Sequence, residues 1–208
     1  MVDLSSDATE LTPVAYTAPT EQEQHEAHKE WVEKEGGIEH PTHIFTLDRL
    51  EQKERIRWLI DHCEGTVIDI GCNWGFVSNE MGASMGIDIN PENIKYAKGA
   101  FPRIRFCIGD IIQGLAFPDG AYDTVVLADI LEHLDWQLVD FAVVEASRIC
   151  RRKVLITLPW KPTRKFAYCF KHKWIPGTNH IGHIVQMLMY GKVSVQSDMN
   201  FVYMEALK

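Results

Sequence analysis

The sequence has no apolar run long enough to span a bilayer and no segment patterned as a secretory signal. Its five cysteines include no C-x-x-C pair. Their odd number and irregular spacing indicate free thiols in a reducing compartment. These absences predict a cytoplasmic protein with no membrane segment and no disulfide framework.

Acidic residues are missing between Ala146 and Gln196, although the whole chain of 208 residues carries a net charge of −8. Ten of its 21 Lys and Arg residues fall in that interval. The overall acidity argues against a general polyanion binder. We interpret the basic interval first as an exposed, solvated face and second as a rim that attracts an anionic substrate.

The length and the apolar share of 46% predict one folded domain with an N-terminal extension. Residues 1–20 are rich in Ser, Thr, Ala, Pro and Asp without periodicity, and we expect a disordered tail there. Residues 21–62 are expected to form a helical segment and a lid over the ligand site. Residues 63–208 are expected to form the ligand-binding domain.

Short apolar segments alternate with helical patterns from residue 66 onward. A long amphipathic helix is expected at 134–150, and residues 186–190 are expected to lie in a last helix. Strands are expected at 66–70, 84–89, 104–109, 122–128, 153–158, 193–196 and 201–207. The pattern predicts an α/β fold of Rossmann-like, doubly wound type, with a mostly parallel seven-stranded sheet and a C-terminal antiparallel hairpin. The ligand should then lie beyond the carboxyl ends of the strands.

The first strand leads into a loop bounded by glycines, T-V-I-D-I-G-C-N-W-G at 66–75. Gly71 and Gly75 let the backbone approach a ligand closely, and Asp69 is expected to point a carboxylate into that mouth. The chain lacks the G-x-G-x-x-G that a pyrophosphate needs, and a carboxylate would repel phosphate. A cationic nucleoside such as S-adenosylmethionine therefore fits better than a nicotinamide dinucleotide.

Three acids end three successive predicted strands: Asp69, Asp88 and Asp110. Asp88 follows Asp69 by 19 residues, a separation at which an acid commonly binds ribose hydroxyls in doubly wound folds. Each acid alone is most simply a cap or a turn former. That interpretation is much weaker for a set of three at strand ends.

Over about residues 65–159 the chain resembles the class I S-adenosylmethionine-dependent methyltransferases, in particular the methyltransferase type 11 and ubiquinone-pathway O-methyltransferase group. The matching segments are 67–75, 86–90, 107–110, 117–123 and 129–133. Asn73 departs from the pattern, because the family usually has Gly there. The resemblance implies that these residues contact the cofactor: Asp69, Gly71, Cys72, Asn73, Asp88, Ile89, Asp110, Ile111 and Asp129.

The resemblance also implies where each part of the cofactor lies. Asp69 and Gly71 would border the methionine end. Asp88 would bind the ribose hydroxyls, with Ile89 against the adenine. Asp110 would accept a hydrogen bond from the adenine amino group beside the backbone of Ile111.

A candidate metal site, which is also the candidate catalytic site, follows the fourth strand as Asp129-Ile-Leu-Glu132-His133. A helical turn beginning at about residue 130 would put the three polar groups on one face, where they could hold a divalent ion. The segment is similar to the acid-x-x-Glu-His of metal-using ubiquinone-pathway and small-RNA 2′-O-methyltransferases. The second group takes a further histidine from downstream, which would be His180 or His183 here.

The identity of such an ion stays open among Mg²⁺, Mn²⁺ and Zn²⁺, since an imidazole ligand is unusual for Mg²⁺. Alternatively no metal is used, and His133 is a general base or a structural residue. Residues 160–183 follow the fifth strand and are expected to form a loop, whose aromatic and basic residues are candidates for contacts with the acceptor.

The favoured hypothesis is O-methylation of a small-molecule acceptor, such as a sugar or a phenol, by a monomer or a homodimer. One alternative is methylation of RNA or another nucleic acid through the basic residues of 148–192, against which the overall acidity counts. Another is a non-catalytic partner that binds the cofactor to stabilise an assembly.

Overall fold

A computed structural model describes residues 50–159, 173, 177–188, 191–198 and 201–208, all within one compact unit, Pro41–Lys208. The predicted tail at 1–20, the helix and lid predicted within 21–49, and residues 160–172 lie outside the described residues. The predicted domain boundaries therefore stay predictions.

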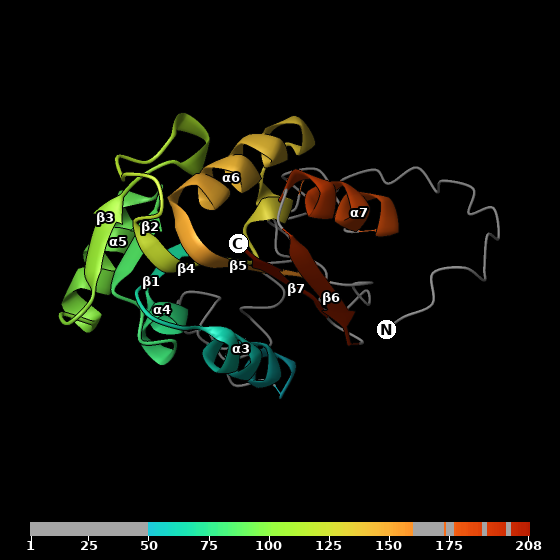
Figure 1. The fold of residues 1–208 in the computed structure, drawn as a ribbon. Helices are drawn as coiled ribbons and strands as arrows, with labels where there is room; N and C mark the ends of the chain where they lie inside the picture. Colours follow the sequence, from blue (N-terminus) through green and yellow to red (C-terminus); the bar gives the residue numbers. More distant parts are fainter. Residues whose placement is uncertain (1–49, 160–172, 174–176, 189–190, 199–200) are drawn as a thin grey trace, which may run out of the picture. The chain divides into compact units, whose positions relative to one another are not determined.

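A seven-stranded sheet organises the described residues, in the order β3-β2-β1-β4-β5-β7-β6 (Figure 1). Neighbours among the first five strands pair in parallel, and β7 pairs antiparallel with both β5 and β6. The strands are β1 (Val67–Ile70), β2 (Met85–Asp88), β3 (Arg105–Ile108), β4 (Tyr122–Ala128), β5 (Cys150–Pro159), β6 (Lys192–Ser197) and β7 (Phe201–Leu207). The predicted fold class, including the C-terminal hairpin, is confirmed.

Helices cover both faces of the sheet. Helices α6 and α7 lie on one side, and α3 and α4 lie on the other (Figure 1). The helices are α3 (Leu50–His62), α4 (Phe76–Glu80), α5 (Pro91–Ala100), α6 (Trp136–Ile149) and α7 (Thr178–Met187), with 3₁₀ turns η1 (Ile111–Gln113) and η2 (Leu131–His133). The strands alternate accordingly: Val125 and Leu127 of β4 belong to the same apolar cluster as α6, and Val126 packs in a second cluster with Leu59 of α3.

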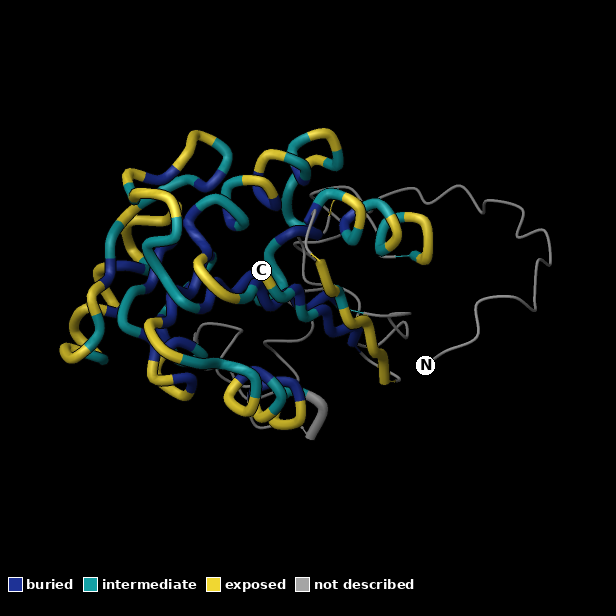
Figure 2. Tube along the Cα trace, viewed as in Figure 1, coloured by how far each residue is buried: buried dark blue, intermediate teal, exposed yellow. Residues whose placement is uncertain are grey.

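Burial follows this layering. The central strands are buried and the outer faces of the helices are exposed (Figure 2). Strand β6 forms an edge of the sheet and is mostly exposed. Each large aliphatic side chain buried in this way contributes roughly 1.5–3 kcal/mol relative to an exposed one. Within the described residues, no helix combines the length and the apolar character needed to cross a membrane.

Helix α5 begins as the sequence predicts. The Asn90 side chain accepts a hydrogen bond from Glu92 N at 2.9 Å, and Pro91 occupies the first helical position. The Asn90 side chain satisfies one of the unpaired N–H groups at the start of the helix, and Pro91 has no N–H to leave unpaired. The cap also fixes the chain direction directly after β2, where the candidate site begins.

Helix α7 corrects two expectations. It spans Thr178–Met187, whereas the sequence predicted a last helix containing residues 186–190 and a substrate loop reaching residue 183. Ile184 and Leu188 of this segment are buried in the cluster that contains α6, and Ile181 packs partly against it. His180 and His183 therefore lie on a packed helix, not on a loop. Scattered His and Gly residues between the apolar positions obscured the helical spacing.

Candidate functional site

The turn after β1 passes close to the ends of β2 and β4. Gly71 N and Cys72 N both donate to the carbonyl oxygen of Ile87, at 2.7 and 2.9 Å. Gly71 has φ +77°, and a Cβ placed there would lie 2.7 Å from Cδ1 of Ile130. Glycine is therefore required for the turns after β1 and β4 to approach each other.

Asp88 ends β2 and holds that turn in place. Asn73 N donates to its Oδ2 at 2.8 Å, and Asn90 N donates to its Oδ1 at 2.8 Å. Asn73 has φ +50°, a left-handed conformation that Asn tolerates better than most residues. The side chain of Ile89, the next residue, is exposed to 67%. The contact of Asp88 with the ribose and of Ile89 with the adenine stays a prediction.

Asp69 does not point into open space as the sequence pattern predicts. It is 2% exposed, and Ser78 Oγ of α4 donates to its Oδ2 at 2.5 Å. Its side chain leaves β1 on the face that α4 covers, so the helix closes over the carboxyl group. Burial raises the pKa of Asp69 to about 6, although the Ser78 hydrogen bond opposes the shift. Cofactor contact by Asp69 stays a prediction.

Asp110 follows β3 and caps η1, with Ile112 N donating to its Oδ1 at 3.0 Å. Among the described residues no hydrogen bond engages its Oδ2. The Ile111 side chain is buried in the core, which leaves its backbone as the part able to face a ligand. Gly109 N donates to the carbonyl oxygen of Asp88 at 3.1 Å, so the ends of β2 and β3 are joined directly.

Asp129 directly follows β4, has φ +54° and contacts two residues that no sequence pattern singled out. Thr157 Oγ1 of β5 donates to its Oδ1 at 2.7 Å, and Nη1 of Arg55 lies 3.4 Å from its Oδ2. Arg55 is 6% exposed, and its guanidinium lies 5.5 Å from the centre of the Phe201 ring. Helix α3 thus brings a buried positive charge to the end of β4.

Glu132 faces the interior within η2 and is fully buried. Burial, followed by the charge of Asp129, raises the pKa of Glu132 well above its ordinary value. Its carbonyl oxygen accepts a hydrogen bond from Lys173 N at 2.7 Å, and Lys173 Nζ donates to Asp135 Oδ1 at 2.8 Å. His133 is half-buried at the end of the same turn.

The predicted metal site is not supported. Within the described residues, no group of three or more His, Cys, Asp or Glu side chains is placed to hold a metal ion. Glu132 is turned inward and Asp129 toward Thr157 and Arg55, because η2 is a 3₁₀ turn and not the expected α-helical one. On α7, His183 Nε2 lies 2.6 Å from Asp140 Oδ1, and the His180 ring packs on Trp136 at 4.5 Å.

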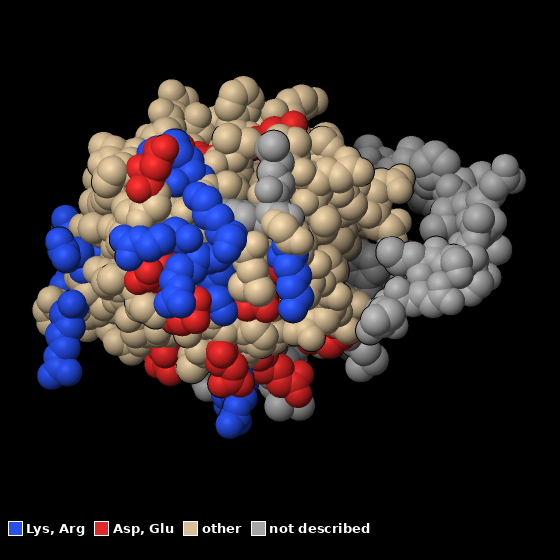
Figure 3. Space-filling view, viewed as in Figure 1, with Lys and Arg blue, Asp and Glu red and all other residues tan. Residues whose placement is uncertain are grey.

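The start of the basic interval lies away from the site. Residues 148–153 cover the end of α6 and the amino end of β5. Asp88 and Asp129 lie at the carboxyl ends of their strands, so the two regions are at opposite ends of the parallel strands. Lys and Arg side chains lie among acidic ones on the face drawn in Figure 3. The ion pairs are Arg148 with Glu145 and Asp119, Arg151 with Asp123, Arg152 with Glu64, and Lys153 with Glu205. These four residues form a paired surface and not a substrate rim; Lys161, Arg164, Lys165 and Lys171 lie outside the described residues.

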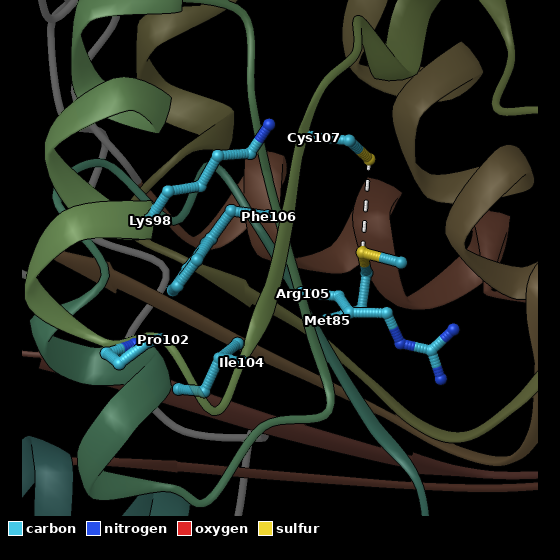
Figure 4. A pocket seen from close by; sticks show the side chains of 7 residues that line it. All are labelled: Met85, Lys98, Pro102, Ile104, Arg105, Phe106 and Cys107. Carbon is cyan, nitrogen blue, oxygen red and sulfur yellow. Dashed lines mark hydrogen bonds between the residues drawn. The ribbon is translucent and has the colours of Figure 1, made fainter.

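A hollow of about 420 Å³ lies along β3, at the outer edge of the sheet (Figure 4). In it, Cys107 Sγ lies 3.9 Å from Met85 Sδ. Its lining residues are Met85, Lys98, Pro102, Ile104, Arg105, Phe106 and Cys107. None of them belongs to the candidate site, which is built instead at the carboxyl ends of β1, β2, β3 and β4.

Comparison with known proteins finds one family model and solved structures of the same fold. Residues 67–153 match the sequence model of a family described as a methyltransferase domain. No curated protein matches the chain. That matched interval contains every residue of the candidate site from Asp69 to His133.

Solved structures share the fold at low sequence identity. An S-adenosylmethionine-dependent methyltransferase from Archaeoglobus fulgidus is 20% identical, with a TM-score of 0.65 over 81% of this chain and 100% of that one. Magnesium protoporphyrin IX methyltransferase from Synechocystis PCC 6803, with bound S-adenosylhomocysteine, is 15% identical, with a TM-score of 0.62 over 89% and 95%. A methyltransferase from Thermotoga maritima, described as a possible histamine N-methyltransferase, is 13% identical, with a TM-score of 0.59 over 76% and 96%.

Proposed function

We propose that the chain is a class I S-adenosylmethionine-dependent methyltransferase and that it transfers the methyl group to a hydroxyl of a compact small molecule. The arrangement of acids and glycine at the carboxyl ends of β1 to β4 carries this proposal. Asp88 and Asp110 offer acceptors for a ribose and an exocyclic amine, and Gly71 allows the turn after β1 to pass close to the turn after β4. These residue types fit a nucleoside that bears a cation and no phosphate.

When bound, the cofactor supplies a methyl group that is already electrophilic on its sulfonium. The chain then has to align an acceptor oxygen with that carbon and remove the proton of the hydroxyl. Alignment can supply roughly 7–11 kcal/mol of the barrier. The site is anchored to four strand ends that are joined by backbone hydrogen bonds, which favours a fixed geometry over a mobile one.

His133 is the proposed base. It lies in η2, the 3₁₀ turn that follows β4 and Asp129 in the chain. An imidazole titrates near neutral pH and can take the proton of a hydroxyl, an effect worth typically ~10²–10⁴-fold. Glu132 is the neighbouring buried acid, and its raised pKa favours the protonated, uncharged form.

The test pairs binding with turnover. His133→Ala should retain the wild-type affinity for S-adenosylhomocysteine, measured by calorimetry, and should lose roughly 10²-fold or more in the rate of S-adenosylhomocysteine release on a panel of hydroxyl acceptors. His62→Ala, at the end of α3, is the control and should change neither quantity. If the wild type binds no S-adenosylhomocysteine, the cofactor assignment is wrong. If His133→Ala keeps full activity, the base is another group.

The length of the chain supports the proposed acceptor class. At 208 residues the chain has little room for a separate substrate domain beside the sheet and its helices. Residues 148–153 are paired with acids at the far edge of the sheet, so they do not favour a nucleic-acid acceptor. A compact hydroxyl compound is therefore the acceptor class that we propose.

A further inference from the structure

Strand β6 is an edge of the sheet that its own sequence does not protect. It pairs with β7 in an unbroken register from Lys192 to Ser197, and all of its residues except Val193 are exposed (Figure 2). Residues 193–197 contain no charged side chain and no proline. Natural edge strands usually carry charges, prolines or bulges that prevent pairing with another strand. Because β6 has none of these between residues 193 and 197, it can accept a further strand.

The other edge of the sheet is less suited to pairing. Strand β3 is four residues long and carries the exposed Arg105. The hollow along that edge is lined by a second cation, Lys98 (Figure 4). A short edge strand with a charged side chain is protected in the usual way. An added strand is therefore expected at β6 and not at β3.

The hairpin determines which backbone groups of β6 point away from β7. Asp198 N donates to the carbonyl oxygen of Phe201 at 3.0 Å, so these two residues form a hydrogen-bonded pair. In antiparallel strands, hydrogen-bonded and non-hydrogen-bonded pairs alternate. Counting back from Asp198 along the register, the even-numbered residues of β6 bond to β7. The residues whose N–H and C=O groups point outward are therefore the odd-numbered ones, Val193, Val195 and Ser197.

A second copy of β6 matches these groups when the two strands run antiparallel about a two-fold axis at Val195. Val195 then meets Val195 of the second copy, and Val193 meets Ser197. This is the only register in which the three outward residues of each strand all pair with one another. Each such pair exchanges two backbone hydrogen bonds. A symmetric contact of this kind closes a dimer and leaves neither β6 edge open.

The same register places opposite charges at both ends of the paired strands. Lys192 lies directly opposite Asp198 of the second copy, and the two-fold axis repeats this contact. Both residues are exposed, and side chains directly opposite each other on paired strands can interact. Phe201 N and the Tyr203 hydroxyl donate to Asp198, which fixes its carboxylate at the end of the strand. Charge complementarity therefore favours a second copy of this chain over an unrelated strand.

We propose that the protein forms a homodimer in which the two copies of β6 pair antiparallel and join the two sheets into one. Val195, whose residue is 41% exposed in the single chain, contacts its symmetry mate in the dimer. Strand β6 lies beyond β7, whereas the candidate site lies at the carboxyl ends of β1 to β4 (Figure 1). The contact is therefore separate from the proposed function, and either can fail without the other.

Sedimentation equilibrium of the full chain is the first test. The wild type should associate to a dimer and no further, with a dissociation constant of roughly 100 µM or lower. A protein that remains monomeric at that concentration overturns the proposal and leaves the edge to a strand of another protein. Open-ended association overturns it as well, because a closed two-fold contact does not continue beyond two copies.

Val195→Pro tests the backbone contact. The Val195 N–H points away from β7, so proline removes hydrogen bonds of the dimer and none of the hairpin. The variant should keep the wild-type circular dichroism spectrum and show a dissociation constant raised at least roughly tenfold. Val195→Thr keeps both the N–H and the branched side chain, and it should dimerise as the wild type does. If Val195→Pro also dimerises like the wild type, the contact lies elsewhere and the proposal is wrong.

Lys192→Glu tests the register. It sets an acid against Asp198 of the second copy at both ends of the contact, so the dissociation constant should rise roughly tenfold, and by less at high salt. Lys98→Glu, at an exposed position of α5, is the control and should leave the dissociation constant unchanged. An unchanged value for Lys192→Glu would overturn the register and the proposal with it. Should Val195→Pro fail to fold, Val195→Lys, which sets like charges against each other at the axis, must dissociate the dimer.

Discussion

Asp69 links the charge of a single residue to the stability of the fold. Burial raises the pKa of Asp69 from 3.8 to about 6. Because the folded state holds the proton more tightly than the unfolded state, the contribution of Asp69 to stability is complete below the unfolded pKa and is lost as the pH rises through about 6. The loss is roughly 3 kcal/mol, since each pKa unit corresponds to about 1.4 kcal/mol.

We therefore expect Asp69→Asn to unfold in urea with a free energy that changes less than the wild-type value between about pH 4 and pH 7. Glu80→Gln, which replaces an exposed acid of α4, should keep the wild-type pH dependence. The pKa of the buried Glu132 is also raised, so its contribution to the stability of the fold falls as the pH rises. Some pH dependence of the unfolding free energy should therefore remain in the variant. An Asp69→Asn curve that superimposes on the wild type would show that Asp69 stays ionised when buried.

Substitution of Gly71 tests whether the turns after β1 and β4 need to lie close together. Gly71→Ala places a Cβ 2.7 Å from Ile130 and forces a residue with a side chain to hold φ +77°. The backbone strain alone costs about 1–2 kcal/mol, and the contact adds to it. We expect a lower free energy of unfolding and weaker binding of S-adenosylhomocysteine, measured by urea titration and calorimetry.

Gly82→Ala is the matched control, because Gly82 has φ +64° and a Cβ added there would meet no other atom within 4 Å. It should show the cost of the backbone strain without the contact and should leave cofactor binding intact. The difference between the two variants isolates the approach of the β1 and β4 turns. Equal effects on stability and binding would mean that this approach is unimportant.

At the scale of elements, α7 depends on packing more than on local signals. Ile184 is fully buried in the cluster shared with α6. Ile184→Ala should cost about 2–5 kcal/mol, the range for truncating a buried aliphatic side chain. Gln186→Ala, on the exposed side of the helix, should stay within about 0.5 kcal/mol of the wild type. Chemical denaturation of both variants gives the comparison, and equal values would contradict the docking of α7 on α6.

At the scale of the whole molecule, the C-terminal hairpin is part of the domain. Strand β7 lies between β5 and β6, and Met204 on it is fully buried in the main core cluster. Met204→Asp buries an unpaired charge and should abolish the cooperative thermal transition. Gln196→Asp, at an exposed position of β6, should melt as the wild type does. If Met204→Asp still melts cooperatively and binds S-adenosylhomocysteine, the hairpin is not needed for folding of the domain.

Features that depend on neighbouring residues were readable from the chain alone. The alternation of strands and helices, the Asn90 cap of α5 and the placement of Asp69, Asp88 and Asp110 at strand ends follow from local periodicity and turn chemistry. Parallel strands bring their carboxyl ends to one end of the sheet, so the sequence also predicted where a ligand site should lie.

Side-chain partners from distant segments were decided by the tertiary structure. Arg55 reaches Asp129, and Asn93 bridges Trp74 and Asp88, because helices packed on the sheet set their directions. Packing also explains why the predicted metal site is not supported. Glu132 lies in a 3₁₀ turn and is buried, and His183 lies on α7, where its ring contacts Asp140. Sequence spacing determines which residues share an element, but packing determines which way each of them points.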